Sequence, residues 1–259
     1  MSRDSLINII NDTLYKCDNE YKWMIDNSKN IYYNDNYFKI DSMIKKFSNA
    51  NIKLIKKTTV DAIIENKCKV FAVLNFASAK KPGGGVLNGA IAQEEALARA
   101  SSLYPVIKQC EDFYVPTPSA PYYSDRIIYS KNIYVFKDDY GVDIEPIKCD
   151  VITCAAPNYS FGIFKYDNHQ KVIKQRFTKI LKSAIVNGQR NLILGAWGCG
   201  VFKNPPNVNA EIFRDVLNDY SNYFDEIIFA IPDNINYDIF KKKLFNLSDF
   251  EKDINKYNI

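Results

Sequence analysis

The chain has 259 residues, 47% of them hydrophobic, which suits one large domain or a domain with an extension. Its 34 basic and 30 acidic residues give a net charge of +4, a mild bias toward anionic partners that selects no function class. The sequence has no apolar run near the roughly 18 residues that cross a bilayer, and no signal-peptide pattern. We therefore expect a cytosolic protein, or a nuclear one if its source is eukaryotic.

Helical and strand patterns alternate along the first half of the chain. Apolar residues recur at helical spacing over 4–15, behind Ser2 or Asp4 as a cap, and predict an N-terminal helix. A polar passage rich in Asn and Tyr follows. Residues 52–66 then predict a short strand and a helix, and 69–77 predict an apolar strand of the kind that is buried on both faces.

The second half continues this alternation. The pattern predicts a helix over 92–110, strands over 126–130, 132–138 and 150–157, a helix over 169–188 ended by Gly188, a strand over 191–197, a helix over 207–221 and a strand over 225–232. Apolar strands that alternate with amphipathic helices indicate a parallel or mixed sheet covered on both faces. Such sheets bind ligands at the carboxyl ends of their strands.

Two glycine-rich loops each follow a buried strand. One contains three consecutive glycines, 83–85, and the other spans 195–200 and leads through Asn204 into a predicted helix. Glycine accepts positive φ and leaves no side chain between a ligand and the backbone N–H groups, so such loops can hold phosphate oxygens. The helix N-terminus would add a further field that attracts anions. The alternative is a pair of tight strand-to-helix turns.

Several common chemistries find little support. The second loop lacks the third glycine of the dinucleotide fingerprint, and neither a P-loop nor a spaced cluster of metal ligands is present. The single histidine, His169, lies in a polar segment and is expected to be a solvated residue at a helix start. We expect the six cysteines to be reduced core thiols, because no CxxC pair occurs and most have apolar neighbours.

Carboxylates remain as candidates for chemistry. Gln93, Glu94 and Glu95 open the helix that follows the triple glycine. Acidic residues in a first turn also complement the helix dipole, and Glu95 can pair with Arg99 at i+4, so a structural role is open. A glutamate aimed at a sugar ligand could protonate a leaving oxygen and then activate water. Partial burial and the nearby Glu94 would raise the pKa of such a glutamate toward neutrality, as the acid role requires.

The stretch "LNFASAKKPGGGVLNGAIAQEEALARASSLYP", residues 74–105, resembles the signature of the microbial-type poly(ADP-ribose) glycohydrolases, a macrodomain family in which a short spacer separates GGG from QEE. Blocks at 122–138, 150–158 and 192–206 resemble later parts of the same family in the same order, and the resemblance runs from about Leu6 to Ile231. It implies an α/β fold, a macrodomain-like three-layer α/β/α core with a mixed central sheet. It also implies an N-terminal helical extension over 1–50 packed on the core, a catalytic core over 51–245 and a tail over 246–259.

The resemblance also implies roles for individual residues. Glu95 would be the catalytic acid and base at the ribose–ribose bond, and Glu94 would hold hydroxyls of the terminal ribose and help to position the substrate. The substrate-binding residues would be Asn75, Gly83, Gly84, Gly85, Gln93, Gly198, Cys199, Gly200, Val201, Phe202 and Asn204. Lys203 stands where a small residue is common in such loops, and Asn158 is a candidate for an adenine contact. No metal and no cofactor is implied.

The function that follows is a poly(ADP-ribose) glycohydrolase that acts from chain ends and releases ADP-ribose. Its partners would be poly(ADP-ribose) or ADP-ribosylated macromolecules, without a membrane partner, and we expect a monomer. Two alternatives stay open from the residues. One is a hydrolase of single ADP-ribose units on protein, nucleic acid or a small-molecule ester, and the other is a non-catalytic ADP-ribose-binding macrodomain.

Overall fold

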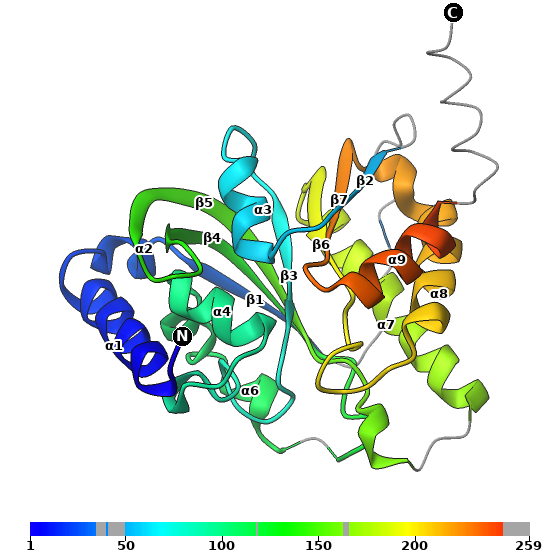
Figure 1. Cartoon of the computed structure of the whole chain (residues 1–259), viewed down its shortest axis with the longest axis horizontal. Helices are drawn as coiled ribbons and strands as arrows, with labels where there is room; N and C mark the ends of the chain where they lie inside the picture. Colours follow the sequence, from blue (N-terminus) through cyan, green and yellow to red (C-terminus); the bar gives the residue numbers. More distant parts are fainter. Residues whose placement is uncertain (35–39, 41–49, 118, 163–165, 246–259) are drawn as a thin grey trace, which may run out of the picture.

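The computed structural model describes residues 1–34, 40, 50–117, 119–162 and 166–245 of the chain. Within these residues the strands form one seven-stranded sheet in the order β1-β4-β5-β3-β6-β7-β2 (Figure 1). The strands from β5 to β2 in this order run parallel, and β4 runs antiparallel to both β1 and β5. The strands are β1 (Lys29–Tyr33), β2 (Asn51–Ile55), β3 (Ala72–Phe76), β4 (Ile127–Lys137), β5 (Asp143–Cys154), β6 (Asn191–Leu194) and β7 (Glu226–Ala230).

Helices cover both faces of the sheet. The described helices are α1 (Arg3–Asn19), α2 (Lys22–Asp26), α3 (Thr59–Glu65), α4 (Gln93–Ala100), α5 (Leu103–Ile107), α6 (Glu111–Tyr114), α7 (Tyr166–Val186), α8 (Pro206–Tyr220) and α9 (Asn234–Leu244). Phe177, Phe213 and Phe240 of α7, α8 and α9 pack in the core on one face. Ile63 and Leu97 of α3 and α4 pack in the core on the other. The expected three-layer α/β/α architecture, mixed sheet and helical N-terminus are therefore confirmed.

The segment 92–110, predicted as one helix, forms the two short helices α4 and α5, and α6 begins directly after it at Glu111. Ser101 leaves the helical conformation with φ −147° and ψ 174°, and its hydroxyl bonds back to the carbonyl of Leu97 at 2.6 Å. The backbone N–H of Ser102 then donates to Tyr134 O of β4 at 3.0 Å. Serine side chains compete with the helix ladder in this way, so the sheet contact at this point replaces helical bonds.

Two predicted strands, 126–130 and 132–138, are one strand, β4. The register with β5 shifts between Ser130 and Ile133, where Asn132 adopts φ 59° and its N–H donates to the carboxylate of Asp150 at 3.1 Å. Asparagine tolerates this left-handed conformation, and a β-bulge bends the strand without ending it. The predicted break is therefore a bulge. Strand β1 and helices α2, α6 and α9 were not predicted from the sequence.

The N-terminal segment is part of the sheet as well as a helical layer. Strand β1 pairs antiparallel with β4, so the predicted extension over 1–50 supplies an edge strand. The predicted tail over 246–259 lies outside the described residues, and the boundaries of the predicted domains stay predictions. None of the described helices is both long and apolar enough to cross a membrane.

Charged groups tie helix α1 to the turn between β4 and β5. The helix begins behind Ser2, whose hydroxyl accepts from Ser5 N, as the cap prediction expected. The buried ammonium of Lys137 pairs with Asp12 of α1 at 2.6 Å and with Asp143 at 2.5 Å, and Lys16 also pairs with Asp143. Hydrogen bonds from Lys137 and Lys16 hold the pKa of Asp143 below its usual range. The helix position therefore depends partly on an ionised carboxylate.

We expect Asp143→Asn to lower the melting temperature near neutral pH. Because the folded-state pKa of Asp143 is depressed, its contribution is present above the unfolded pKa of about 3.9 and is lost as pH falls through the folded pKa. The side chain is half exposed, so the loss should stay below about 1 kcal/mol. Thermal melts at about pH 7 and about pH 3 check this, with Asp219→Asn on the exposed face of α8 as control. An equal loss at both pH values would contradict it.

Candidate active site

Both glycine-rich loops leave the same edge of the sheet. Strands β3 and β6 are parallel neighbours, β3 ends at Phe76 and β6 ends at Leu194, and the loops that follow them lie in the lower half of Figure 1. The first loop runs through Gly83–Gly85 to α4, and the second runs to Pro206 at the start of α8. The carboxyl edge of the sheet thus brings together the two loops that the sequence separates by about a hundred residues.

The triple glycine lies directly against the two glutamates of α4. Gly83 and Gly84 adopt φ 65° and φ 57°, conformations that favour glycine. A Cβ at Gly84 would lie 2.5 Å from Oε1 of Glu95 and 3.0 Å from Oε2 of Glu94. A Cβ at Gly83 would lie 2.6 Å from the ring of Tyr104. The glycines are therefore required by close packing as well as by backbone conformation.

Glu95 is held by the backbone of this loop. Its Oε1 accepts from Gly85 N at 2.9 Å, and only 8% of the residue is exposed. Arg99, one turn further along α4, does not form an ion pair with Glu95 and donates instead to Ala90 O at 2.8 Å. Burial lowers the pKa of Arg99, while the charge of Glu95 opposes that change. One oxygen of Glu95 is thus fixed by a neutral donor, and no lysine or arginine of the described residues forms an ion pair with the carboxyl group.

Glu94 is the more deeply buried carboxyl group, at 3% exposure. Its Oε2 accepts from Ser78 N at 2.7 Å and its Oε1 from Asn75 Nδ2 at 3.4 Å. Burial, with a smaller contribution from the charge of Glu95, raises the pKa of Glu94 to about 8, although the hydrogen bonds to its oxygens lower it. At neutral pH this group is largely protonated.

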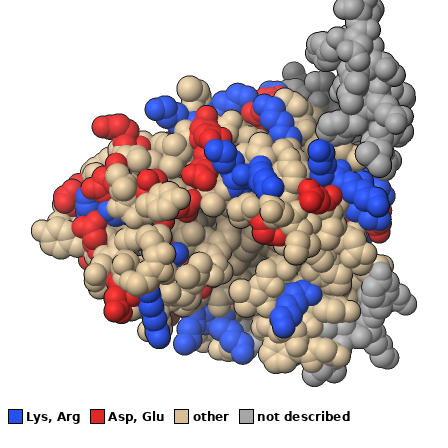
Figure 2. Space-filling view, in the orientation of Figure 1, with Lys and Arg blue, Asp and Glu red and all other residues tan. Residues whose placement is uncertain are grey.

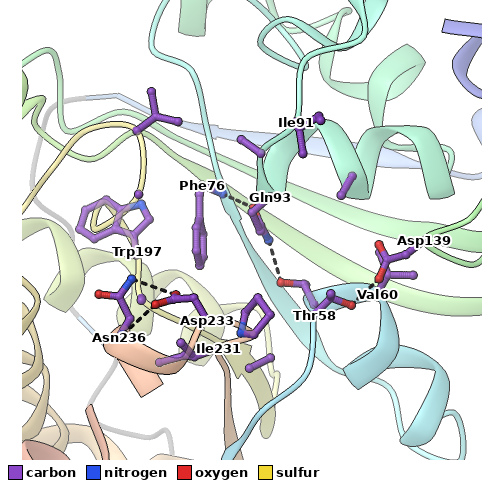
Figure 3. A pocket seen from close by; sticks show the side chains of 18 of the residues that line it. Thr58, Val60, Phe76, Ile91, Gln93, Asp139, Trp197, Ile231, Asp233 and Asn236 are labelled. Atoms are coloured by element: carbon purple, nitrogen blue, oxygen red, sulfur yellow. Dashed lines mark hydrogen bonds between the residues drawn. The ribbon is translucent and has the colours of Figure 1, made fainter. Parts of the chain in front are cut away.

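Gln93 fixes the start of α4 to the sheet. Its Oε1 accepts from Phe76 N at 2.8 Å, and its Nε2 donates to Thr59 Oγ1 at 3.1 Å (Figure 3). Its Nε2 also donates to Leu74 O at 2.9 Å. The amide supplies hydrogen-bond partners for backbone groups at the end of strand β3. It also joins β3, α3 and α4 at one point. Gln93 therefore sets the direction in which the two glutamates that follow it project.

The second loop is held by buried asparagines. Gly198 adopts φ 80°, and a Cβ there would lie 2.7 Å from Asn204 Nδ2, which donates to Gly198 O at 2.8 Å and to Pro157 O at 2.9 Å. Burial raises the pKa of the Cys199 thiol to about 12, so it stays protonated. Gly200 and Val201 are exposed, and the ring of Phe202 lies 5.8 Å from that of Tyr123. The loop therefore presents backbone and an aromatic ring to the same side.

A cavity of about 550 Å³ extends from the second loop across the ends of the strands (Figure 3). Among its lining residues are Gly198, Gly200, Val201, Phe202 and Gln93, all of which the sequence predicted, and Thr58, Asp139, Asp233 and Asn236, which it did not. The last four come from three separate parts of the chain and carry no motif, so only the fold brings them together. Neither Glu94 nor Glu95 lines this cavity, so the carboxylates lie beside it. A cleft of this size suits a nucleotide-sized ligand.

Other residues singled out in the sequence lie elsewhere or differ in burial. Asn158 does not line the cavity, and its Nδ2 donates to Tyr123 OH at 3.1 Å. His169 lies at the start of α7, as predicted, but it is fully buried against Tyr159, and burial lowers its pKa to about 4. The expectation that it is solvated was wrong. All six cysteines are free thiols, yet Cys68 is exposed rather than in the core.

A model of the family described as microbial-type PARG, catalytic domain, matches residues 4–138. The chain belongs to this family. The match spans the triple glycine and both glutamates, so the resemblance noted in the sequence is confirmed. Among curated proteins, none matches the chain. No group of three or more His, Cys, Asp or Glu residues in the described part of the chain is placed to hold a metal ion.

Solved structures of PARG enzymes are similar to this chain along most of its length. Poly(ADP-ribose) glycohydrolase from Thermomonospora curvata is 29% identical, with a TM-score of 0.83 over 93% of this chain and 100% of that one. The same enzyme bound to the inhibitor ADP-HPD is 30% identical, with a TM-score of 0.81 over 93% and 99%. The enzyme from Deinococcus radiodurans in complex with ADP-ribose is 35% identical, with a TM-score of 0.71 over 78% and 86%.

We expect Gly84→Ala to abolish most activity of this PARG-family protein while the fold survives. A methyl group at this position must displace the Glu95 carboxyl group, and misplacement by about 1 Å can cost about a hundredfold in rate. Gly188→Ala is the matched control, because Gly188 has φ 77° and nothing within 4 Å of an added Cβ. Both variants lose about 1–2 kcal/mol from the left-handed backbone. Equal activity in the two variants, measured beside their melting temperatures, would contradict the role of close packing.

We expect Glu94→Gln to stabilise the protein at alkaline pH. The folded state keeps a proton on Glu94 up to about pH 8, whereas the unfolded chain releases it near about pH 4.3, so stability falls as pH rises between these values. Glutamine can keep the bond from Ser78 N and donate to Asn75, whose Oδ1 has no hydrogen-bond partner among the described residues.

Melting temperatures at about pH 5 and about pH 9 check this expectation for Glu94→Gln. The variant should exceed the wild type by several degrees only at the higher pH. Glu145→Gln, at an exposed position of β5, should show no such difference. A variant with the same pH dependence as the wild type would mean that the Glu94 carboxyl group titrates in its ordinary range.

Proposed function

We propose that the protein is a poly(ADP-ribose) glycohydrolase that removes ADP-ribose from chain ends, with Glu95 as the general acid and base. The observation that carries the proposal is the pair of buried carboxyl groups against the triple glycine, beside a cavity of about 550 Å³ that the second glycine loop lines. Membership of the PARG family and similarity to PARG structures solved with ADP-ribose or ADP-HPD support it.

The two loops suit a sugar diphosphate. Backbone N–H groups at Gly83–Gly85 and at the second loop can approach phosphate oxygens closely, because no side chain intervenes at the glycines. Helix α8 begins at Pro206, after the second loop, and its N-terminus adds a positive field on this side of the sheet. Phe202 offers an apolar face on which a ribose can pack. The terminal ADP-ribose unit would therefore lie between the loops, with its ribose toward α4.

In the proposed reaction, Glu95 gives up a proton in the first step and takes one back in the second. Glu95, acting as the general acid, gives a proton to the oxygen that joins the two riboses, and the bond from that oxygen to the anomeric carbon breaks. Positive charge develops on the sugar ring, and the diphosphate held by the loops stabilises it. Water then adds to the anomeric carbon and returns a proton to Glu95. The products are ADP-ribose and a polymer that is shorter by one unit.

Glu94 has a different part in this scheme. It is almost fully buried, it is fixed by Ser78 N and Asn75, and its pKa of about 8 keeps it largely neutral at the start of the reaction. A neutral carboxyl group can donate to a ribose hydroxyl as well as accept from one. It also leaves Glu95 beside an uncharged neighbour. Glu94 would therefore position the ribose, while Glu95 moves the proton.

The compartment and the assembly state are part of the same proposal. A mixed surface charge with a net value of +4 suits a soluble protein of the cytosol, or of the nucleus, that meets a polyanionic substrate. Both loops and the cavity belong to one chain, so the proposed site needs no second copy. We therefore propose that the protein acts as a monomer.

We expect Glu95→Gln to abolish release of ADP-ribose from purified poly(ADP-ribose), with a loss of at least about a hundredfold, because glutamine cannot give up a proton in this role. Binding of ADP-ribose, measured by calorimetry, should survive, since the amide oxygen can still accept from Gly85 N. Chromatography of the products checks the activity, with Glu145→Gln as the surface control.

Two results would redirect the assignment. Turnover retained by Glu95→Gln would remove this residue from the role of acid and base. Absence of turnover by the wild type, together with ADP-ribose binding, would favour a non-catalytic reader or a hydrolase of single ADP-ribose units, which assays on mono-ADP-ribosylated protein and nucleic acid separate.

A further inference from the structure

We propose that Lys80 and Lys81, with Lys203 on the opposite loop, form a phosphate-binding rim for the ADP-ribose unit next to the one removed. This rim, defined by these three lysines, would hold the diphosphate of the part of the polymer that leaves. The inference rests on the proposed function and extends it from the terminal unit to the chain behind it. Its consequence is a preference for polymer over substrates with an uncharged leaving group.

The turn that carries Lys80 and Lys81 is bonded to the carboxylate pair. The hydroxyl of Ser78 accepts from Lys80 N and from Lys81 N, both at 3.2 Å, and Ser78 N donates to Oε2 of Glu94 at 2.7 Å. One serine therefore connects the two lysines to the buried acids through its own backbone and side chain. The two lysines therefore belong to the turn that adjoins the site at which bond cleavage is proposed.

The positive charges of the rim are not paired with a carboxylate within the described part of the protein. Lys80, Lys81 and Lys203 are exposed, and within the described residues their ammonium groups form no ion pair and no hydrogen bond. By contrast Lys53, Lys69 and Lys137 each pair with a carboxylate. No Asp or Glu occurs over 77–92 or over 195–206, so both loops are purely basic outside the QEE helix. Figure 2 shows basic side chains along the lower edge of the face with the central hollow.

Lys203 adds an observation of its own. It adopts φ 54°, a left-handed conformation that glycine or asparagine occupies at lower cost. A lysine kept in that conformation, directly after Phe202, places a cation on the loop that follows β6, the parallel neighbour of β3. Strain held at such a position is a reason to look for a ligand.

The chemistry of the substrate decides which phosphate the rim meets. The terminal unit lies among the glycine N–H groups, and its reacting ribose meets carboxyl groups that are at most 8% exposed. The leaving oxygen belongs to the adenosine ribose of the next unit, and the diphosphate of that unit is only a few bonds further on. That diphosphate must lie outside the buried acids, at the exposed surface. The exposed lysines of the adjoining turn supply cations on this side of the acids.

The test compares two substrates that share the terminal unit. Purified long poly(ADP-ribose) has the next diphosphate, and an aryl glycoside of ADP-ribose has an uncharged phenol in its place. We compare the wild type, Lys80→Ser/Lys81→Ser and the control Lys241→Ser/Lys242→Ser, an adjacent pair toward the far end of α9 (Figure 1). ADP-ribose binding by calorimetry serves as a second readout for the terminal unit.

We expect kcat/KM on the polymer at low salt to fall about three- to tenfold in Lys80→Ser/Lys81→Ser, the range that two exposed ion pairs give. The difference should vanish near about 1 M salt, where charges are screened within about 3 Å. Activity on the aryl glycoside and the Kd for ADP-ribose should change less than about twofold. Lys203→Asn, which suits the left-handed backbone, should cause a smaller loss on polymer alone.

Three results would overturn the proposal. Equal losses on both substrates, or a matching loss of ADP-ribose affinity, would assign the lysines to the terminal unit. Polymer activity equal to that of the control pair would leave the rim without a role. A wild type that binds ADP-ribose but cleaves neither substrate would overturn the proposed function, and the rim with it. The first two results would overturn the rim alone.

Discussion

The burial of two adjacent carboxyl groups against backbone is the constraint on which the site depends. An ionised carboxylate out of water is costly unless it is hydrogen-bonded or neutralised. Here Glu95 accepts from Gly85 N, and Glu94 accepts from Ser78 N and has its pKa raised to about 8 by burial. In both cases the loop must approach the carboxyl oxygens closely, and Gly84 allows that approach because it has no Cβ.

The contact between the triple glycine and the two glutamates also constrains the spacer between GGG and QEE, because the spacer must return the chain to the start of α4. The spacer forms a short 3₁₀ turn over Val86–Asn88 and reverses at Gly89, whose φ is 68°. Helix α1 holds this reversal, since Arg3 Nε donates to Asn88 O at 2.8 Å and Thr13 Oγ1 donates to Arg99 O at 2.5 Å. Helix α1, whose described residues form no hydrogen bond or ion pair with either glutamate, thereby helps to fix the position of both.

The sequence could predict those parts of the molecule that depend on local pattern. A pattern within a few neighbouring residues identifies the order of strands and helices, the two glycine loops and the start of α4. Strand β1 has no such local pattern, because it is a half-exposed edge strand within a polar passage. Its pairing with β4 joins residues about a hundred positions apart. The bulge at Asn132 was mistaken for a break for the same reason, since β5 supplies its stabilising carboxylate, Asp150.

The lysines lie at the rim, outside the site, for an electrostatic reason. A lysine beside Glu94 or Glu95 would favour the ionised carboxylate and depress its pKa, and an acid catalyst must be protonated when the substrate binds. Backbone N–H groups attract phosphate without adding a full positive charge, so the glycine loops can hold a diphosphate beside a protonated acid. The buried cation one turn along α4, Arg99, is directed toward the carbonyl of Ala90. Full positive charge is compatible with this chemistry only where water screens it from the acids, and that is where Lys80 and Lys81 lie.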